Sequence, residues 1–202
     1  MKLYYSRGAC SLAPHIALYE TGLPFTVART DTKTKLLEDG SDFRAISPNG
    51  YVPVLELDSG ERLTEAGVVL QYIADQKPAS GLIPALGTLE RYRVMEWLTF
   101  ISSEVHKSYS PLFRPTTPED YKPVAKTLLA QRLGYVNEQL AGKQFLLGDQ
   151  FTVADAYLFV VVNWSRAVGV DLSPFPNLQQ FQERVAKRPA VQSALKAEGL
   201  VK

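Results

Sequence analysis

The sequence predicts a two-part fold, in which an α/β domain is followed by an all-α domain. In residues 1–78 short strands alternate with helices and turn residues, whereas beyond residue 88 only helical periodicity remains. Between these regions, residues 77–87 contain two prolines and two glycines, a composition typical of a linker. We therefore expect domains at 1–78 and 88–202, joined by a linker over 79–87.

The first domain divides into a βαβ unit and a ββα unit. Residues 3–5 and 25–28 are expected to form strands on either side of a helix over 11–20, which Gly22 ends. Residues 54–57 and 62–64 are expected to pair as a hairpin across the turn at 58–60, and a helix over 65–76 follows.

The second domain shows apolar residues at helical spacing. This spacing predicts helices over 89–110, 119–140, 153–166, 177–188 and 190–197. Thr152 and Asp155 have the spacing of a capping box at the start of the helix over 153–166. Our interpretation of Asp155 is therefore structural rather than catalytic.

Composition and charge argue against several classes of protein. Lysine and arginine total 22 against 21 for aspartate and glutamate, which gives no excess charge for nucleic acid or an anionic membrane surface. The longest apolar stretch, 158–162, is far shorter than the ~20 residues that span a bilayer, and the N-terminus lacks a secretory pattern. One cysteine excludes an intrachain disulfide, and with two histidines it is too few for a structural zinc site. We expect a cytoplasmic protein with no metal, no membrane partner and no nucleic-acid partner.

Cys10 is the sharpest candidate for chemistry. It lies at the start of the helix over 11–20, where the exposed amides and the positive end of the helix dipole favour a thiolate. Gly8 indicates an exposed turn, Ser11 is expected to cap the helix, and Tyr5 ends the preceding strand. The alternative is a buried, inert cysteine, which is common for this residue type.

Short motifs are spread along the whole chain, at residues 2–6, 8–12, 50–55, 63–66, 104–107, 111–113 and 198–200. Together with the order of elements they resemble the cytosolic glutathione transferases, and the motifs at 2–6 and 8–12, with Cys10 in the second, are similar to those of the bacterial beta class. The resemblance implies a thioredoxin-like first domain, glutathione as co-substrate, conjugation to small hydrophobic electrophiles, and a homodimer. Arg7, Ala66 and Thr99 depart from the pattern, where proline, serine or glycine, and asparagine are usual.

The resemblance implies a role for several residues of the first domain. Val52, followed by a cis Pro53, would pair with the glutathione backbone, and the segment with Glu65 and Ala66 would hold the γ-glutamyl end. Lys35 would meet the glycyl carboxylate. Without the resemblance, the better interpretation of Val52 and Pro53 would be an ordinary edge-strand turn. That of Glu65 would be an acidic residue in a first helical turn, and that of Lys35 a solvated lysine.

Near the sulfur, the resemblance implies a further set of contacts. Cys10 would hold glutathione, as a mixed disulfide in some members of the class, and Ser11 would donate a hydrogen bond to the glutathione sulfur with Tyr5 close by. His106 would stabilise a thiolate or accept a proton, although a lone helical histidine is more often structural. The remaining implied glutathione contacts are Thr99, Ser103, Glu104 and Lys107, of which Thr99 and Ser103 would contribute hydrogen bonds from the neighbouring subunit. The implied wall of the electrophile pocket consists of Tyr109, Phe113 and Trp164, for which helical core is an equal alternative.

The same residues are compatible with two other functions. One is a glutathione-dependent reductase of disulfides or peroxides that works through a Cys10 mixed disulfide. The other is a non-catalytic binding or regulatory protein of the same fold. The presence of Cys10, Glu65 and His106 at family positions counts against the second.

Overall fold

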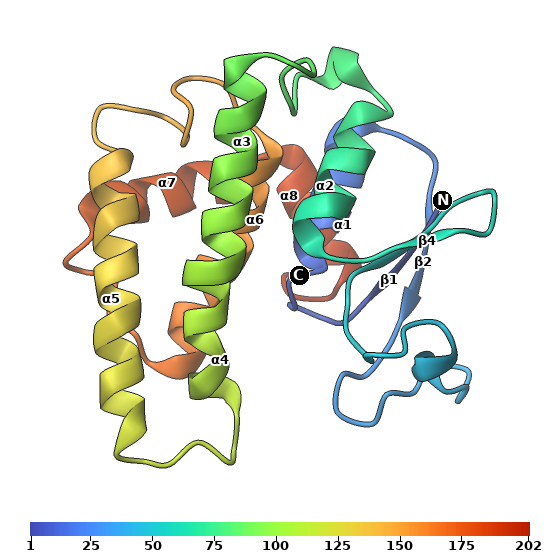
Figure 1. Cartoon of the computed structure of the whole chain (residues 1–202), viewed down its shortest axis with the longest axis horizontal. Coiled ribbons are helices and arrows are strands. Elements are labelled where there is room, and N and C mark those ends of the chain that lie inside the picture. Colours follow the sequence, from blue (N-terminus) through green and yellow to red (C-terminus); the bar gives the residue numbers. More distant parts are fainter. The chain divides into compact units, whose positions relative to one another are not determined.

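The computed structural model describes residues 1–202, which form two compact units. The first unit comprises residues 1–83 and 188–202, and the second comprises 84–187. The first unit contains β1 (Lys2–Tyr5), α1 (Leu12–Thr21), β2 (Thr26–Arg29), η1 (Phe43–Ala45), β3 (Val54–Glu56), β4 (Arg62–Leu63), α2 (Ala66–Asp75), η2 (Pro78–Ser80) and α8 (Pro189–Ala197), and Figure 1 labels its helices α1, α2 and α8. The second unit contains α3 (Leu89–Phe100), η3 (Ile101–His106), α4 (Lys107–Phe113), α5 (Tyr121–Gln139), α6 (Val153–Val168) and α7 (Pro176–Ala186).

The first unit is built on a four-stranded sheet of order β2-β1-β3-β4. β1 is parallel to β2 and antiparallel to β3, which in turn is antiparallel to β4. A parallel pair needs a crossover, and α1 supplies it between β1 and β2. The expected βαβ and ββα units are confirmed, and with them the thioredoxin-like fold of this unit.

Apolar residues on both faces of the sheet form the core of the first unit. Leu3 and Leu55 are opposite each other in β1 and β3 and are completely buried, as is Ile16 of α1. Because side chains alternate along a strand, Tyr4 and Val54 project to the other face, where they pack with Phe43 and form a second cluster. Burying one such side chain stabilises the fold by roughly 1.5–3 kcal/mol. The two clusters therefore fix the end of β1 and the start of β3.

The C-terminal helix α8 belongs to the first unit. It packs against α1, and Arg188 just before it forms a two-pronged ion pair with Glu20 of α1 at 2.6 and 3.0 Å. The sequence expectation placed residues 88–202 in one helical domain. In the structure, residues 188–202 instead belong to the compact unit of residues 1–83. The reason is that the short α8 buries its apolar face on α1 rather than on the other C-terminal helices.

The long helix expected over 89–110 contains a change of helix type. α3 ends at Phe100, residues 101–106 form a π-helical segment, and α4 continues to Phe113 with Pro111 inside it. The π-helical segment is a short insertion within a longer helix, with i→i+5 hydrogen bonds in place of i→i+4, and six residues are too few for apolar periodicity to reveal the change. His106 is the last residue of this segment.

The capping box at the start of α6 is confirmed. The Asp155 carboxylate accepts hydrogen bonds from the Thr152 N–H at 2.8 Å and the Thr152 hydroxyl at 2.9 Å, and also from the Leu146 N–H at 2.8 Å. Complete burial raises the pKa of Asp155 to about 6, against the opposing effect of these hydrogen bonds. The carboxylate thus ties the preceding loop to the helix, as its structural interpretation requires.

Candidate active site

Cys10 lies in the tight turn between β1 and α1. The turn closes through hydrogen bonds from the Ala9 N–H to the Ser6 carbonyl and from the Leu12 N–H to the Ala9 carbonyl, each 3.0 Å long. Gly8 adopts a φ of 68°, a conformation in which glycine carries no steric penalty. The Cys10 side chain is half-buried rather than enclosed, which argues against the inert alternative. Its thiol donates to the Val52 carbonyl, with 3.2 Å between sulfur and oxygen.

The Val52–Pro53 peptide bond is cis, as expected. Pro53 is buried and leads directly into β3, which pairs with β1 so that Val54 lies opposite Tyr4. This pairing brings the loop before β3 beside the turn after β1. The backbone of Val52 and the Cys10 sulfur therefore share one edge of the sheet.

Ser11 does not cap α1, so that expectation is wrong. Its backbone is already helical, with φ −61° and ψ −16°, and no helix amide reaches its side chain. The hydroxyl instead bonds the loop before it: the Ser6 N–H donates to it at 3.1 Å and it donates to the Ser6 carbonyl at 3.3 Å. Ser11 is completely buried in this role, and its donation to a glutathione sulfur stays a prediction.

Tyr5 is largely buried at the end of β1, with its ring 5.6 Å from that of His15. Burial, and to a lesser extent the charge of Glu198, raise the pKa of Tyr5. Its phenol therefore stays protonated at neutral pH.

Glu65 is the residue just before α2, and its backbone is unusual. Its φ of 63° is rare for a residue with a side chain, and such conformations cluster at functional sites. The Glu65 side chain is exposed, whereas Ala66 is buried against the core. The first amides of a helix have no partner within it, so the start of α2 combines exposed amides with an acidic side chain.

Lys35 and Lys33 differ clearly in the structure. Lys33 is exposed, whereas Lys35 is half-buried and its ammonium donates to the Gly50 carbonyl at 2.7 Å. The same ammonium lies 5.5 Å from the centre of the Tyr51 ring. Lys35 is thus held against the loop that precedes Val52, which favours it over Lys33 as a ligand for a carboxylate.

The C-terminal segment contacts the Cys10 turn, a feature that the sequence reasoning missed. One oxygen of Glu198 accepts from the Gly8 N–H at 2.8 Å, and the other lies 3.0 Å from Nδ1 of the buried His15. Arg7, where the resemblance leads one to expect proline, donates from its guanidinium to the Gly199 carbonyl. The motif at 198–200 was visible in the sequence, but nothing there indicated its partner.

In the second unit, His106 lies in an aromatic cluster. Its ring packs edge to face on Trp164 with 4.8 Å between centroids, and its Nδ1 is 2.7 Å from the hydroxyl of Tyr157. Burial, and to a lesser extent the charge of Lys107, lower the pKa of His106 to about 4. The imidazole is therefore neutral at physiological pH.

Trp164 is the centre of this cluster, because Tyr109 and Phe113 also pack on it, each with 5.7 Å between centroids. Phe113 is 50% exposed and Trp164 is half-buried, as residues on the wall of a pocket would be. Tyr109 is instead completely inaccessible, and its hydroxyl lies 2.5 Å from that of Ser165. The core alternative therefore holds for Tyr109, since α4 turns this side chain onto α6.

The other implied glutathione contacts occupy the outer side of this helical segment. Thr99 and Ser103 are exposed, and each donates its hydroxyl to a carbonyl one turn back, those of Met95 and Thr99, at 2.9 and 3.0 Å. Glu104 accepts from the Arg132 guanidinium at 2.8 Å, while Lys107 is exposed.

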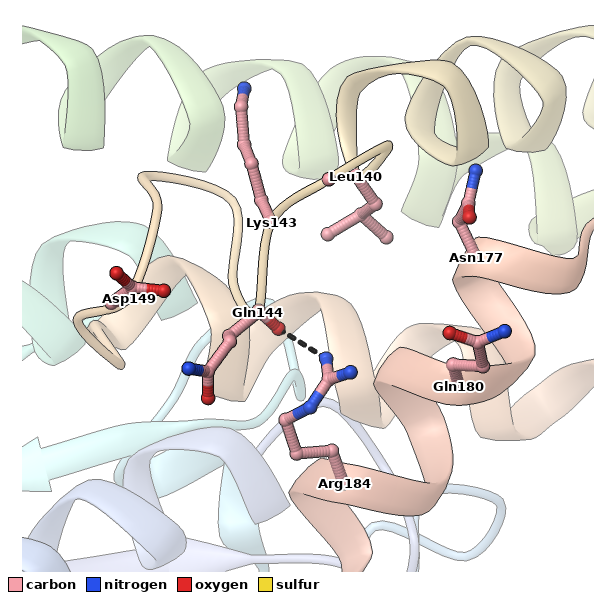
Figure 2. Close-up of a pocket in the computed structure, with 8 residues that line it drawn as sticks. Leu140, Lys143, Gln144, Asp149, Asn177, Gln180 and Arg184 are labelled. Carbon is pink, nitrogen blue, oxygen red and sulfur yellow. Dashed lines mark hydrogen bonds between the residues drawn. The ribbon is translucent and has the colours of Figure 1, made fainter.

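A polar pocket of the second unit takes no part in this arrangement. It lies between the end of α5, the following loop and α7, where the Arg184 guanidinium donates to the Gln144 carbonyl at 2.6 Å (Figure 2). Its walls carry neither a thiol nor an imidazole. No helix is both long and apolar enough to cross a membrane. Nowhere do three or more His, Cys, Asp or Glu side chains gather in a way that could hold a metal ion.

Comparison with known proteins decides the family. Residues 8–76 match the family model "Glutathione S-transferase, N-terminal domain", and residues 97–189 match "Glutathione S-transferase, C-terminal domain". The chain is 48% identical to glutathione S-transferase GstA of Escherichia coli O157:H7 over 200 residues, covering 99% of this chain and 100% of the relative. The chain belongs to the glutathione S-transferase family.

Solved glutathione S-transferases share its fold over their full length. A sphingomonad glutathione S-transferase complexed with glutathione is 49% identical, with a TM-score of 0.96 and complete coverage of both chains. The bacterial beta class glutathione S-transferase of Sphingomonas chungbukensis is 51% identical, with the same TM-score and coverage. The resemblance to the beta class is thereby confirmed.

Proposed function

We propose that this protein is a glutathione transferase that conjugates the glutathione thiol to small hydrophobic electrophiles. The observation that carries the proposal is the half-buried Cys10 thiol beside the Val52 carbonyl, in a chain that belongs to the glutathione S-transferase family. In the reaction, the glutathione thiolate attacks an electrophilic carbon, a carbon–sulfur bond forms, and the leaving group departs with its electron pair. The thiol proton passes to solvent or to a base.

In this proposal the first unit binds glutathione. The backbone of Val52 pairs with the extended peptide, as a strand edge does with an added strand. Glu65 and the first amides of α2 hold the zwitterionic γ-glutamyl end, and Lys35 meets the glycyl carboxylate. The position of Cys10 beside Val52 supports its contact with the glutathione sulfur.

The second unit supplies the electrophile pocket and a neutral imidazole. The partly exposed rings of Phe113 and Trp164 suit a small hydrophobic compound, and His106 acts on the sulfur. Glu104 and Lys107 complete the glutathione contacts that we assign to this unit, and the exposed hydroxyls of Thr99 and Ser103 contribute theirs from the neighbouring subunit of the dimer.

We further propose a homodimer. Leu89, Tyr92 and Met95 follow a three-residue spacing on α3 and are 66%, 57% and 37% exposed, an apolar stripe on one side of the helix. Sedimentation equilibrium should give twice the chain mass of 22.4 kDa. A species of chain mass at micromolar concentration would refute the dimer.

The activity is tested by turnover of a chloronitrobenzene with glutathione by the pure protein and by a Cys10→Ala variant. We expect conjugation by the wild type and slower conjugation by the variant, since positioning of glutathione survives the loss of one sulfur. Conjugation by neither protein would overturn the proposal.

A second function, reduction of disulfides through a Cys10–glutathione mixed disulfide, is favoured by the half-buried rather than enclosed position of Cys10. It requires this sulfur absolutely: the Cys10 thiolate attacks the glutathione sulfur of a mixed-disulfide substrate, the other half leaves as a thiolate, and a second glutathione then displaces Cys10 as glutathione disulfide forms. Intact mass with and without reductant would detect the adduct, and reductase activity that survives in Cys10→Ala would exclude the mechanism. Failure of glutathione-agarose to retain the protein would favour the non-catalytic alternative.

A further inference from the structure

Tyr157 is a buried residue that no step of the proposed function uses. It lies on α6, two residues after the carboxylate of the capping box, and is only 2% exposed. Its hydroxyl is 2.7 Å from Nδ1 of His106, and the two rings meet at 90° with 6.0 Å between centroids. A rigid element therefore presents a phenol to one nitrogen of the only histidine in the second unit.

The contact decides which ring nitrogen carries the proton. A neutral imidazole has one N–H donor and one acceptor nitrogen, and the hydrogen bond at one nitrogen selects the tautomer. A phenol is a stronger acid than a neutral imidazole, so the arrangement O–H···Nδ1 is favoured over Nδ1–H···O. The proton of His106 then resides on Nε2.

The surroundings hold the ring in the same orientation. Trp164 packs on the imidazole at 70° with 4.8 Å between centroids, so rotation of the ring would break both the packing and the hydrogen bond. Tyr157 is itself held by the start of α6, where Asp155 ties the helix to the loop at Leu146. The capping box thus supports the imidazole through one buried side chain.

We propose that Tyr157 is a positioning residue, which donates its O–H to Nδ1 of His106 and fixes the imidazole as the Nε2–H tautomer. His106 then acts on the glutathione sulfur as a hydrogen-bond donor that stabilises the thiolate, and not as the base that removes its proton. This part of the inference deepens the proposed function and rests on it. The tautomer itself is a property of the protein alone.

The test is a long-range proton–nitrogen correlation spectrum of protein labelled with ¹⁵N in its imidazoles, recorded at neutral pH. Only two histidines are present, so a His106→Asn variant assigns the signals. We expect the wild type to show the Nε2–H pattern and Tyr157→Phe to show a mixture of both tautomers. An Nδ1–H pattern or a mixture in the wild type would overturn the proposal, even if the variant failed to fold.

Tyr109→Phe is the matched control for the spectrum. It removes a phenol oxygen that bonds Ser165 of the same α6, from the turn after His106. We expect this change to leave the His106 pattern unaltered. If it shifted the tautomer as much as Tyr157→Phe does, the effect would be one of general packing and the proposal would fail.

Conjugation kinetics distinguish a failure of the donor role of His106 from a failure of the proposed transferase function. In Tyr157→Phe we expect kcat for conjugation to fall roughly 10-fold, with an unchanged KM for glutathione. A mixed tautomer with undiminished kcat would refute the donor role of His106 while the tautomer assignment stood. Absence of conjugation in the wild type would refute the proposed function instead.

Discussion

The two units hold their candidate site residues in different ways. In the first unit, side chains bond to the backbone of neighbouring loops: Lys35 to Gly50, Cys10 to Val52 and Glu198 to Gly8. In the second unit, the candidates lie on packed helices and touch ring to ring around Trp164. The position of a candidate residue in the first unit thus depends on a few hydrogen bonds. In the second unit the position of each candidate depends on packing against several neighbouring rings. Substitutions in the two units should therefore have different consequences.

The largest difference is expected between the two histidines. His15→Ala removes a completely buried ring and leaves one oxygen of the buried Glu198 carboxylate without this partner, so the free energy of unfolding should fall by about 3–5 kcal/mol. His106→Ala leaves the Tyr157 hydroxyl without this acceptor, and should cost only about 1–3 kcal/mol. Urea unfolding of the wild type and both variants measures these two losses in the free energy of unfolding. A larger loss for His106→Ala would contradict the comparison.

The buried carboxyl group of Asp155, in the second unit, should give the free energy of unfolding an unusual pH dependence. Because the pKa of Asp155 is raised to about 6 in the folded protein, the folded state binds this proton more tightly than the unfolded state does. The stabilisation from this bound proton is then complete below about pH 4 and is lost as the pH rises through 6. The free energy of unfolding should fall over this range by an amount on the order of 2–3 kcal/mol.

Denaturant unfolding between pH 4 and 7 checks this prediction, with Asp155→Asn as the non-titrating control. The stability of the wild type relative to the variant should fall as the pH rises. A relative stability that increases with pH would mean that the three hydrogen bonds to the carboxylate outweigh the cost of its burial.

The smallest effect is expected for the loop lysines. Lys35→Ala should raise KM for glutathione about 10-fold without changing kcat, because an ion pair made equally before and during reaction affects binding alone. Lys33→Ala is the matched control, since this lysine is exposed two residues away in the same loop, and should leave KM unchanged. Equal effects of the two substitutions would show that the loop contributes only general positive charge.

Local patterns were sufficient for most of the fold. The hairpin at 54–64 and the capping box of α6 were predictable because their determinants lie within a few residues of one another. The change to a π-helix over 101–106 was not, since six residues within a longer helix are too few for a change of period to be recognised. The Ser11 cap failed because the serine found a partner in the preceding loop instead of the helix.

For the candidate site, the residues themselves came from the resemblance, and their partners came from the structure. Lys35 was separated from Lys33 by a contact with Gly50, 15 residues further along the chain. Tyr157 and His106 are 51 residues apart, and Glu198 and His15 are 183 apart. No periodicity or spacing rule reaches across such separations, so these partners had no local signal.

The return of residues 188–202 to the first unit imposes an order on biosynthesis. Ribosomes add about 5–20 residues per second, so Glu198 follows His15, 183 residues earlier, by roughly 10–35 s. Until then, neither His15 nor the Gly8 amide can meet its carboxylate. The part of the chain that is made first is therefore the last to reach its final structure, and the helices of residues 84–187 can assemble before it.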